Sequence, residues 1–103
     1  MAFVWDPVKE AVNFRKHHIH FSTAEHIFND PFRVKRLDDD SSITEERYQT
    51  IGEAGAVLFV VYTEEGLDDT RFITARLATA QERRIYHGGD GTAYPYGWER
   101  ADD

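Results

Sequence analysis

Apolar and polar positions at the start of the chain predict an amphipathic helix. Asp6-Pro7 favours a helix start, because an aspartate side chain accepts hydrogen bonds from the first backbone amides and a proline at the first helical position gives none up. The helix is expected to continue to about Lys16, where positive side chains suit the negative end of the helix dipole. One face of this helix carries the apolar side chains Val8, Ala11 and Val12.

Two further helices are predicted from capping-box motifs, in which a serine or threonine is followed three residues later by a glutamate. The first motif is Ser22-Thr23-Ala24-Glu25, and its helix is expected to end at Asp30-Pro31, since a residue before proline disfavours helical backbone. The second motif is Thr79-Ala80-Gln81-Glu82, and its helix is expected to end at Gly88-Gly89.

Four strands are predicted between these helices. The clearest is residues 56–63, a continuously apolar run rich in β-branched and aromatic side chains, which is typical of a central strand covered on at least one face. The others are expected at residues 32–37, 46–51 and 70–76. Because the connections are short, the strands should pair as antiparallel hairpins. The predicted fold class is therefore α+β, with two N-terminal helices, a four-stranded antiparallel sheet and a C-terminal helix.

A chain of 103 residues with 41% apolar residues suits one small domain with its own core. The absence of cysteine excludes disulfides and thiolate metal ligands. The longest apolar run is far shorter than the roughly 20 residues of a membrane-spanning helix, and the N-terminus lacks the features of a signal peptide, so we expect a soluble cytoplasmic protein. Residues 1–87 are expected to form the domain, and residues 88–103 a flexible tail rich in aromatic and acidic side chains.

Charge is distributed unevenly along the chain. The formal net charge is −7, which argues against general binding of nucleic acid, because a phosphate backbone repels an acidic protein. Residues 1–37 nevertheless carry six basic against four acidic side chains, and residues 71–87 carry four against one. Folding could bring these two basic ends together into a site for an anion such as a phosphate. The acidic middle, residues 38–70, could equally be loops whose charges serve solubility alone.

Four side chains are the candidate catalytic residues. Breaking a phosphodiester bond without a metal requires a base for the attacking hydroxyl, positive charge beside the phosphorus and a proton for the leaving oxygen. Arginine suits the second role because its planar guanidinium pairs with two phosphate oxygens and stays protonated. Histidine suits the first or third role because it titrates near neutral pH. The candidates for these roles are Arg76, His17, Arg47 and Lys16, and the candidates for contact with the substrate are Arg83, Arg84 and Tyr86.

Each candidate also has a purely structural interpretation. Arg76 could form a salt bridge with Glu82 or Glu46, and the acidic pair that precedes Arg47 could simply neutralise it. Lys16 could stabilise the helix end alone, an effect of at most about 1 kcal/mol at an exposed position. The sequence leaves both interpretations open.

Histidines are concentrated near the end of the first helix, which raises the possibility of a metal site. Zinc sites need defined spacing and further ligands, and the chain has no His-Glu-x-x-His pattern. We therefore expect no metal and no cofactor, and a metal-dependent hydrolase stays a third alternative. The clustered residues are His17, His18, His20 and His26.

A series of short signatures spans residues 3–87 and resembles a known family. The signatures are Phe3-x-Trp5-Asp6, Lys9, Asn13, Lys16-His17, Phe21, Ala24, Phe28, Asp30-Pro31, Glu45-Glu46-Arg47, Ile51-Gly52, Val60-Val61-Tyr62-Thr63, Ile73-Thr74-Ala75-Arg76, Ala78, Glu82-Arg83 and Tyr86. In this order and spacing the set resembles the BrnT family of toxins from type II toxin–antitoxin systems. The resemblance implies a fold similar to RelE-like ribonucleases and an activity that cleaves RNA and inhibits translation. The candidate catalytic residues Arg76, His17, Arg47 and Lys16 would then act on RNA, with the 2′-hydroxyl as the attacking group. The candidates for contact with RNA would be Arg83, Arg84 and Tyr86.

The resemblance also implies a partner, an antitoxin of the BrnA type with a ribbon-helix-helix DNA-binding part. The two proteins would form a hetero-oligomer in which the antitoxin silences the toxin and makes the contacts with DNA. The chain departs from the family pattern at His18, where glycine is usual, and at Glu65, where arginine is common. These departures and the net charge of −7 favour one alternative, a protein-interaction module with weakened or lost catalysis.

Overall fold

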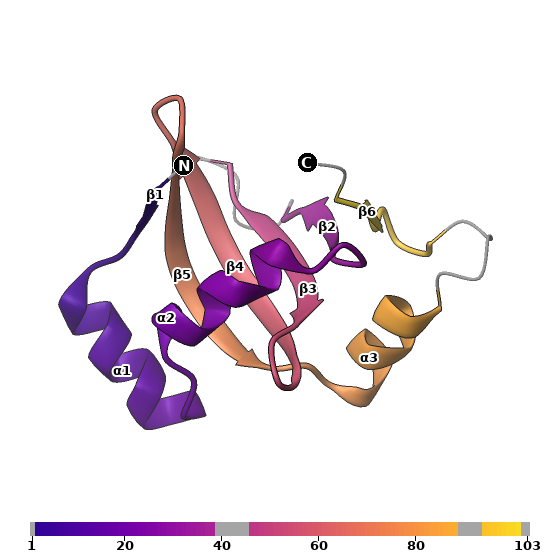
Figure 1. Ribbon diagram of the computed structural model, residues 1–103, viewed down its shortest axis with the longest axis horizontal. Helices are drawn as coiled ribbons and strands as arrows, with labels where there is room; N and C mark the ends of the chain where they lie inside the picture. The colour runs from indigo at the N-terminus through magenta and orange to yellow at the C-terminus, as the bar shows by residue number, and fades with distance from the viewer. Residues whose placement is uncertain (1, 39–45, 89–93, 102–103) are drawn as a thin grey trace.

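The structure is a computed structural model that describes residues 2–38, 46–88 and 94–101. Within these residues the chain forms a six-stranded sheet with helices on both of its faces (Figure 1). The elements are β1 (Ala2–Val4), α1 (Pro7–His17), α2 (Phe21–Ala24), the 3-10 helix η1 (Glu25–Asn29), β2 (Val34–Leu37), β3 (Tyr48–Glu53), β4 (Val57–Glu65), β5 (Asp69–Leu77), α3 (Ala80–His87) and β6 (Glu99–Arg100).

The α+β class and the four predicted antiparallel strands are confirmed, and the sheet has two strands more than expected. The strand order is β1-β5-β4-β3-β2-β6, with β1 parallel to β5 and every other neighbouring pair antiparallel. The sequence pattern predicted no strand at β1, and it placed β6 within the expected tail of residues 88–103. These strands have three and two residues, too few for a periodic pattern, so only pairing with distant strands defines them.

At the end of the chain, the residues that the structure describes lie against the sheet. Trp98 is only 5% exposed and joins the core cluster that α3 covers. Lys35 of β2 lies opposite Glu99 of β6. Trp98 and β6 therefore join residues 94–101 to the sheet, while the boundary at residue 87 stays a prediction.

The starts of the three main helices are fixed in different ways. The Asp6 side chain accepts a hydrogen bond from the Val8 amide, and the capping box that begins with Thr79 is formed, as predicted. The capping box predicted at Ser22 is wrong, because α2 begins at Phe21, with His20 in place of Ser22 at the N-cap, and His20 makes no side-chain cap hydrogen bond. Glu10 of α1 takes that part: its carboxylate accepts from the Phe21 amide at 2.9 Å and contacts His20 at 2.8 Å.

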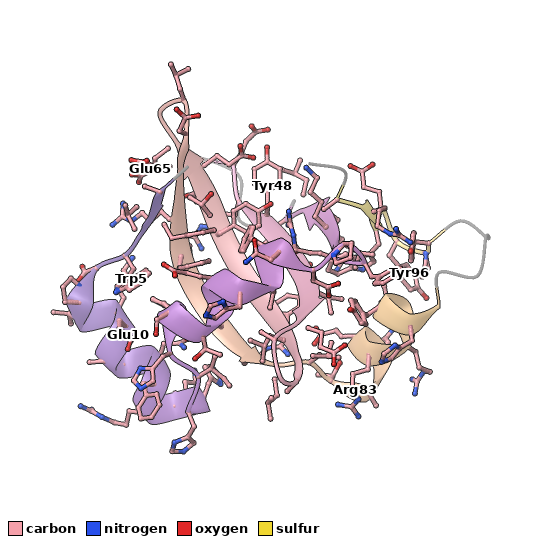
Figure 2. The ribbon with its side chains drawn as sticks, in the orientation of Figure 1. Trp5, Glu10, Tyr48, Glu65, Arg83 and Tyr96 are labelled. Carbon is pink, nitrogen blue, oxygen red and sulfur yellow. The ribbon has the colours of Figure 1, made fainter. Side chains whose placement is uncertain are left out.

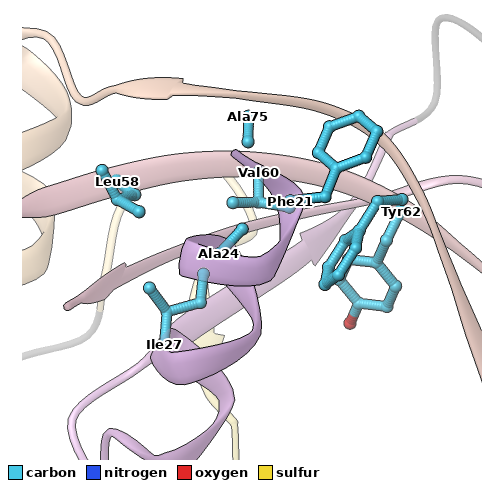
Figure 3. Packing of buried hydrophobic residues seen from close by; sticks show 8 residues of the cluster. Phe21, Ala24, Ile27, Leu58, Val60, Tyr62 and Ala75 are labelled. Atoms are coloured by element: carbon cyan, nitrogen blue, oxygen red, sulfur yellow. The ribbon is translucent and has the colours of Figure 1, made fainter. Parts of the chain in front are cut away.

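The two faces of the sheet have separate cores. On one, which we call the α2 face, α2 and η1 pack on strands β4 and β5 (Figure 3). On the other, which we call the α3 face, α3 and Trp98 pack on β2, β3 and β4. The α2-face cluster is Phe21, Ala24, Ile27, Leu58, Val60, Tyr62, Phe72 and Ala75. The α3-face cluster is Val34, Ile51, Phe59, Ala78, Ile85, Tyr86 and Trp98.

Candidate active site

A buried asparagine holds α1 along the edge of β5. The Asn13 amide donates to the carbonyl oxygens of Ala75 at 2.9 Å and Ile19 at 3.0 Å, and its own oxygen accepts from the Ala75 amide at 3.1 Å. Asn13 thus makes with Ala75 the two bonds that a neighbouring strand would make. This pairing sets the C-terminal turn of α1 beside the last residues of β5. The sequence analysis noticed Asn13 only as part of a family signature.

The end of α1 presents the lysine–histidine pair. The backbone turns out of the helix at His18, whose φ of 61° and ψ of 27° lie in the left-handed region. Lys16 is exposed and His17 is half-buried. Burial lowers the pKa of His17 below its usual value of 6.5, and the positive charges of Lys16 and Arg76 lower that pKa further. Three predicted site residues from the two basic ends therefore lie within electrostatic reach of one another.

Arg76 is held rigidly by its surroundings. Its Nη1 and Nη2 donate to the two carboxylate oxygens of Glu82 at 2.8 and 3.0 Å, and Nη1 also donates to the Leu77 carbonyl oxygen at 3.2 Å. The guanidinium lies over the Phe59 ring, 4.2 Å from its centroid. The salt bridge considered from the sequence is therefore present, and its partner is Glu82. The Arg76 side chain remains 31% exposed, so its remaining surface faces solvent.

Glu82 supports both Arg76 and the start of α3. Its carboxylate accepts from the Thr79 amide at 2.8 Å, and the Thr79 hydroxyl accepts from the Glu82 amide at 3.2 Å. Burial by itself raises the pKa of Glu82, but hydrogen bonds from Arg76 and the Thr79 amide outweigh it and hold the pKa below 4.5. Glu82 therefore stays ionised at neutral pH and neutralises much of the charge of Arg76.

Arg47 lies apart from the other predicted catalytic residues. It precedes β3, whose Tyr48 lies opposite Tyr62, whereas Arg76 lies opposite Phe59 on the same central strand. Arg47 therefore sits towards the far end of β4 from Arg76, and on the other side of that strand. The sequence placed both arginines on neighbouring or next strands but could not give the register between them.

The three predicted RNA contacts of α3 do not share one exposed face. Arg83 and Arg84 are exposed, and Arg83 donates to the Ala78 carbonyl oxygen at 2.9 Å. Tyr86 is only 7% exposed, packs with Ile85 and donates its hydroxyl to the Asp30 carboxylate. Burial and the hydrogen bond to Asp30 raise the pKa of Tyr86. Tyr86 therefore does not share an exposed face with Arg83, and it links α3 to the turn after η1.

Positions on the α3 face add polar side chains that the sequence analysis did not single out. Gln49 and Thr74 both lie opposite Val61, and Arg36 lies opposite Gln49, so these side chains cross the sheet on one face. Arg36 donates to the Gln49 side chain at 2.7 Å and to the Tyr96 carbonyl oxygen at 2.9 Å. Its guanidinium lies 4.5 Å from the centroid of the Trp98 ring. A single arginine in an alternating strand gives no sequence signal that Arg36 would contact Gln49, Tyr96 and Trp98.

Charges at the opposite end of the sheet pair with each other. Figure 2 shows Glu65 at the β4–β5 turn, far from Arg83 on α3. Arg71 donates to the Glu65 carboxylate at 3.0 Å across this hairpin. The carboxylate that departs from the family pattern thus lies away from the cluster of His17, Lys16 and Arg76.

The histidines near the end of α1 make different contacts. His20 bonds to Glu10 and stacks on Phe14 with ring centroids 3.9 Å apart, while His18 meets Phe14 edge-on. Among residues 2–38, 46–88 and 94–101, no three histidine or acidic side chains form a group that could hold a metal ion. In the same described ranges, no helix is long and apolar enough to cross a membrane.

The fold and sequence agree with those of ribonuclease toxins. The structure is similar to the crystal structure of the Brucella abortus ribonuclease toxin BrnT, with a TM-score of 0.60 over 77% of this chain and 97% of that one. The two sequences are 22% identical, so this likeness concerns the fold. Among curated proteins, none matches this chain.

The family assignment rests on the sequence itself. Residues 5–82 match the family described as "Ribonuclease toxin, BrnT, of type II toxin-antitoxin system", which covers well over half of the chain. The chain therefore belongs to the BrnT family of ribonuclease toxins. As a toxin of a type II system, it has an antitoxin as its partner.

Proposed function

We propose that this toxin cleaves RNA without a metal ion, at a site formed by His17, Lys16 and Arg76. The proposal is carried by the junction of α1 and β5, where Lys16 and His17 line one groove with Thr74. Burial lowers the pKa of His17 there, and the charges of Lys16 and Arg76 lower it further. A histidine with a lowered pKa is largely neutral at pH 7, which is the form that accepts a proton.

In the proposed reaction His17 removes the proton of a ribose 2′-hydroxyl. The 2′-oxygen attacks the adjacent phosphorus, and the bond from phosphorus to the 5′-oxygen breaks. The products are a 2′,3′-cyclic phosphate and a 5′-hydroxyl, whose proton comes from solvent. Lys16 and the exposed surface of Arg76 stabilise the negative charge that builds up on the phosphate oxygens.

The bidentate bond to Glu82 gives Arg76 a positioning advantage and an electrostatic cost. It fixes the guanidinium at the end of β5, so little entropy is lost when a phosphate binds. It also reduces the net positive charge of the site. Arg83 and Arg84, both exposed on α3, supply further positive charge for the RNA strand. Arg47, at the far end of β4, serves in this proposal as an RNA contact rather than as part of the reacting centre.

The antitoxin in this proposal is a BrnA-like protein with a ribbon-helix-helix DNA-binding part, and the toxin inhibits translation when released from it. The neutralisation of Arg76 by Glu82 and of Arg71 by Glu65 favours a second candidate function. In that candidate the chain keeps its fold and its binding of the antitoxin but cleaves RNA weakly or not at all.

The test is incubation of the purified chain with a structured RNA in EDTA, followed by analysis of the fragment ends. Cleavage that leaves 2′,3′-cyclic phosphates is expected. His17→Ala should lower the rate by about 10²–10⁴-fold, the usual contribution of a general base. His26→Ala is the matched control, because His26 is exposed on η1 and does not line the groove that contains His17.

The dependence of the rate on pH identifies the role of His17. If His17 is the base, the rate should rise with pH through a midpoint below 6.5 and then stay level, because the lowered pKa makes the neutral form dominant there. Lys16→Ala should move that midpoint upward, since it removes one of the charges that lower the pKa. A folded wild-type chain that leaves RNA intact, also in the presence of ribosomes, would support the second candidate function.

A further inference from the structure

A shallow groove of about 240 Å³ runs between α1 and β5. The groove is lined on one side by a stripe of α1 whose residues are spaced four apart. On the other side it is lined by Ile73 and Thr74 of β5. Val8 and Val12 are 70% and 53% exposed, although both are aliphatic. The sequence analysis placed these two valines on one helix face, and the structure leaves that face uncovered by the described residues.

Positive charge borders this apolar groove. Lys9 and Lys16 lie on the same stripe of α1 as the valines and line the groove with them. Both lysines are exposed in a chain whose net charge is −7. The groove thus combines an aliphatic floor with a basic border, which complements a segment that carries aliphatic and acidic side chains.

We infer that an acidic, amphipathic segment of the antitoxin docks in this groove. Its aliphatic side chains lie against Val8, Val12 and Ile73, and its carboxylates pair with Lys9 and Lys16. RNA would use only the end of this surface at Lys16 and His17, because a phosphate backbone gains nothing from contact with the aliphatic side chains. The inference rests on the proposed function only for its consequence, which is that the docked segment also covers His17.

His17 is the link between docking and inhibition. It lines the groove together with Lys16, so a segment in the groove removes from solvent the proposed base and one proposed phosphate contact. Asn13 fixes α1 to β5, so the groove is already formed in the toxin alone. The antitoxin therefore meets a preformed site, which favours tight binding because no toxin segment has to become ordered.

The experiment measures the affinity of the purified toxin for the full antitoxin encoded beside it, by biolayer interferometry. Val12→Asp places a charge in the apolar floor and should weaken binding by about 30-fold or more. Leu67→Asp is the matched control, because Leu67 is 99% exposed at the β4–β5 turn, and its affinity should stay within about twofold of the wild type. A folded Val12→Asp variant that binds as tightly as the wild type would overturn the inference.

A second variant covers the case in which Val12→Asp unfolds. Lys9→Glu reverses an exposed charge at the groove border and should weaken antitoxin binding by about tenfold, with a smaller dependence on salt. Unchanged affinity and salt dependence would speak against the groove. Hydrogen exchange supplies a direct map: the antitoxin should protect α1 and residues 72–77 of β5, and protection confined to α3 would overturn the inference.

Two further measurements distinguish the antitoxin-docking groove from a nucleic-acid site and from the proposed RNase activity. If an uncleavable 2′-deoxy oligonucleotide loses affinity in Val12→Asp while the antitoxin does not, the groove binds nucleic acid and the inference fails. Cleavage of RNA by the wild-type toxin is measured separately. A toxin that binds antitoxin through the groove but does not cleave RNA would refute the proposed function and leave the docking site intact.

Discussion

Val60 and Val61 are neighbours on the central strand, and they face two different environments. Val60 is fully buried on the α2 face beneath Phe21, Ala24 and their cluster. Val61 is only half-buried on the α3 face, between Gln49 and Thr74. The α2 face is closed by helices and by stacked aromatic rings, whereas α3 covers only part of the other face.

This difference separates the residues that hold the fold from Arg76, a residue of the proposed site. Phe72 touches the rings of Phe3, Trp5, Phe21 and Phe28, so strands and helices far apart in the sequence meet in one apolar cluster. Arg76 sits on the α3 face, where its charge keeps contact with solvent. One face of the sheet is fully covered and the other only partly. A chain of 103 residues can therefore keep both a core and a charged surface.

The largest expected effect on stability comes from the residue that joins α1 to the sheet. Asn13→Ala removes three hydrogen bonds and leaves the backbone groups of Ala75 without them in a buried place. The free energy of unfolding should fall by about 3 kcal/mol, measured by urea denaturation. The conservative variant Asn13→Asp keeps the acceptor but not the donors, and it should be destabilised as well. A loss below about 1 kcal/mol for Asn13→Ala would show that α1 is held by other contacts.

The part of the fold that the sequence predicted is the part with local signals. The sequence predicted strand β4 from its run of apolar residues and α3 from the Thr79 capping box, because each signal depends on residues close in the chain. The short strand β1, the cap that Glu10 gives to α2 and the pairing of Asn13 with Ala75 were missed. Each of these depends on contact between distant segments, which no periodicity encodes.

The candidate site follows the same rule. The two basic ends of the chain suggested that His17 and Arg76 could lie close together. The pKa of His17, which is lowered by burial and by the charges of Lys16 and Arg76, agrees with this. The position of Arg47 required the register of β3 against β4, and the burial of Tyr86 required its bond to Asp30. Strand register and buried polar pairs are tertiary properties, so a list of likely residue types cannot supply them.

A matched pair of substitutions tests the contrast between the two faces directly. Val60→Ala should lower the free energy of unfolding by about 2 kcal/mol, because it removes two buried methyl groups and leaves a cavity. Val61→Ala makes the same chemical change on the half-buried side and should cost less than about 1 kcal/mol. Urea denaturation of both variants gives the difference. Equal losses would mean that the α3 face is packed as tightly as the α2 face.

The salt bridge between Arg76 and Glu82 predicts a dependence of stability on pH. The pKa of Glu82 is lowered in the folded state, so its stabilising contribution is present above about pH 4.5 and is lost as the pH falls through the folded pKa. Glu82→Gln should therefore reduce stability by about 1–2 kcal/mol at pH 7. The gap between the two proteins should narrow below pH 4.5, as measured by thermal unfolding at several pH values.

A second carboxylate serves as the control for this measurement. Glu64→Gln changes an exposed carboxylate on β4 and should alter stability by less than about 0.5 kcal/mol. If the gap between wild type and Glu82→Gln stayed constant from pH 7 to pH 3, the bridge would not contribute through the charge of Glu82. The pair of Arg76 and Glu82 would then stabilise the protein through its hydrogen bonds and not through the charge of Glu82.

The smallest expected effect is a gain, and it concerns the residue that ends α1 beside the proposed site. His18 adopts a left-handed backbone, with φ of 61°, that costs a side chain with a Cβ about 1 kcal/mol relative to glycine. His18→Gly should therefore stabilise the protein by about 0.5–1 kcal/mol, less the edge-on contact with Phe14. His18→Ala removes the ring without relieving the backbone and should not stabilise. Equal stability of the two variants would contradict the backbone explanation. A gain confined to His18→Gly would show that the left-handed backbone of His18 lowers the stability of the protein beside the proposed site.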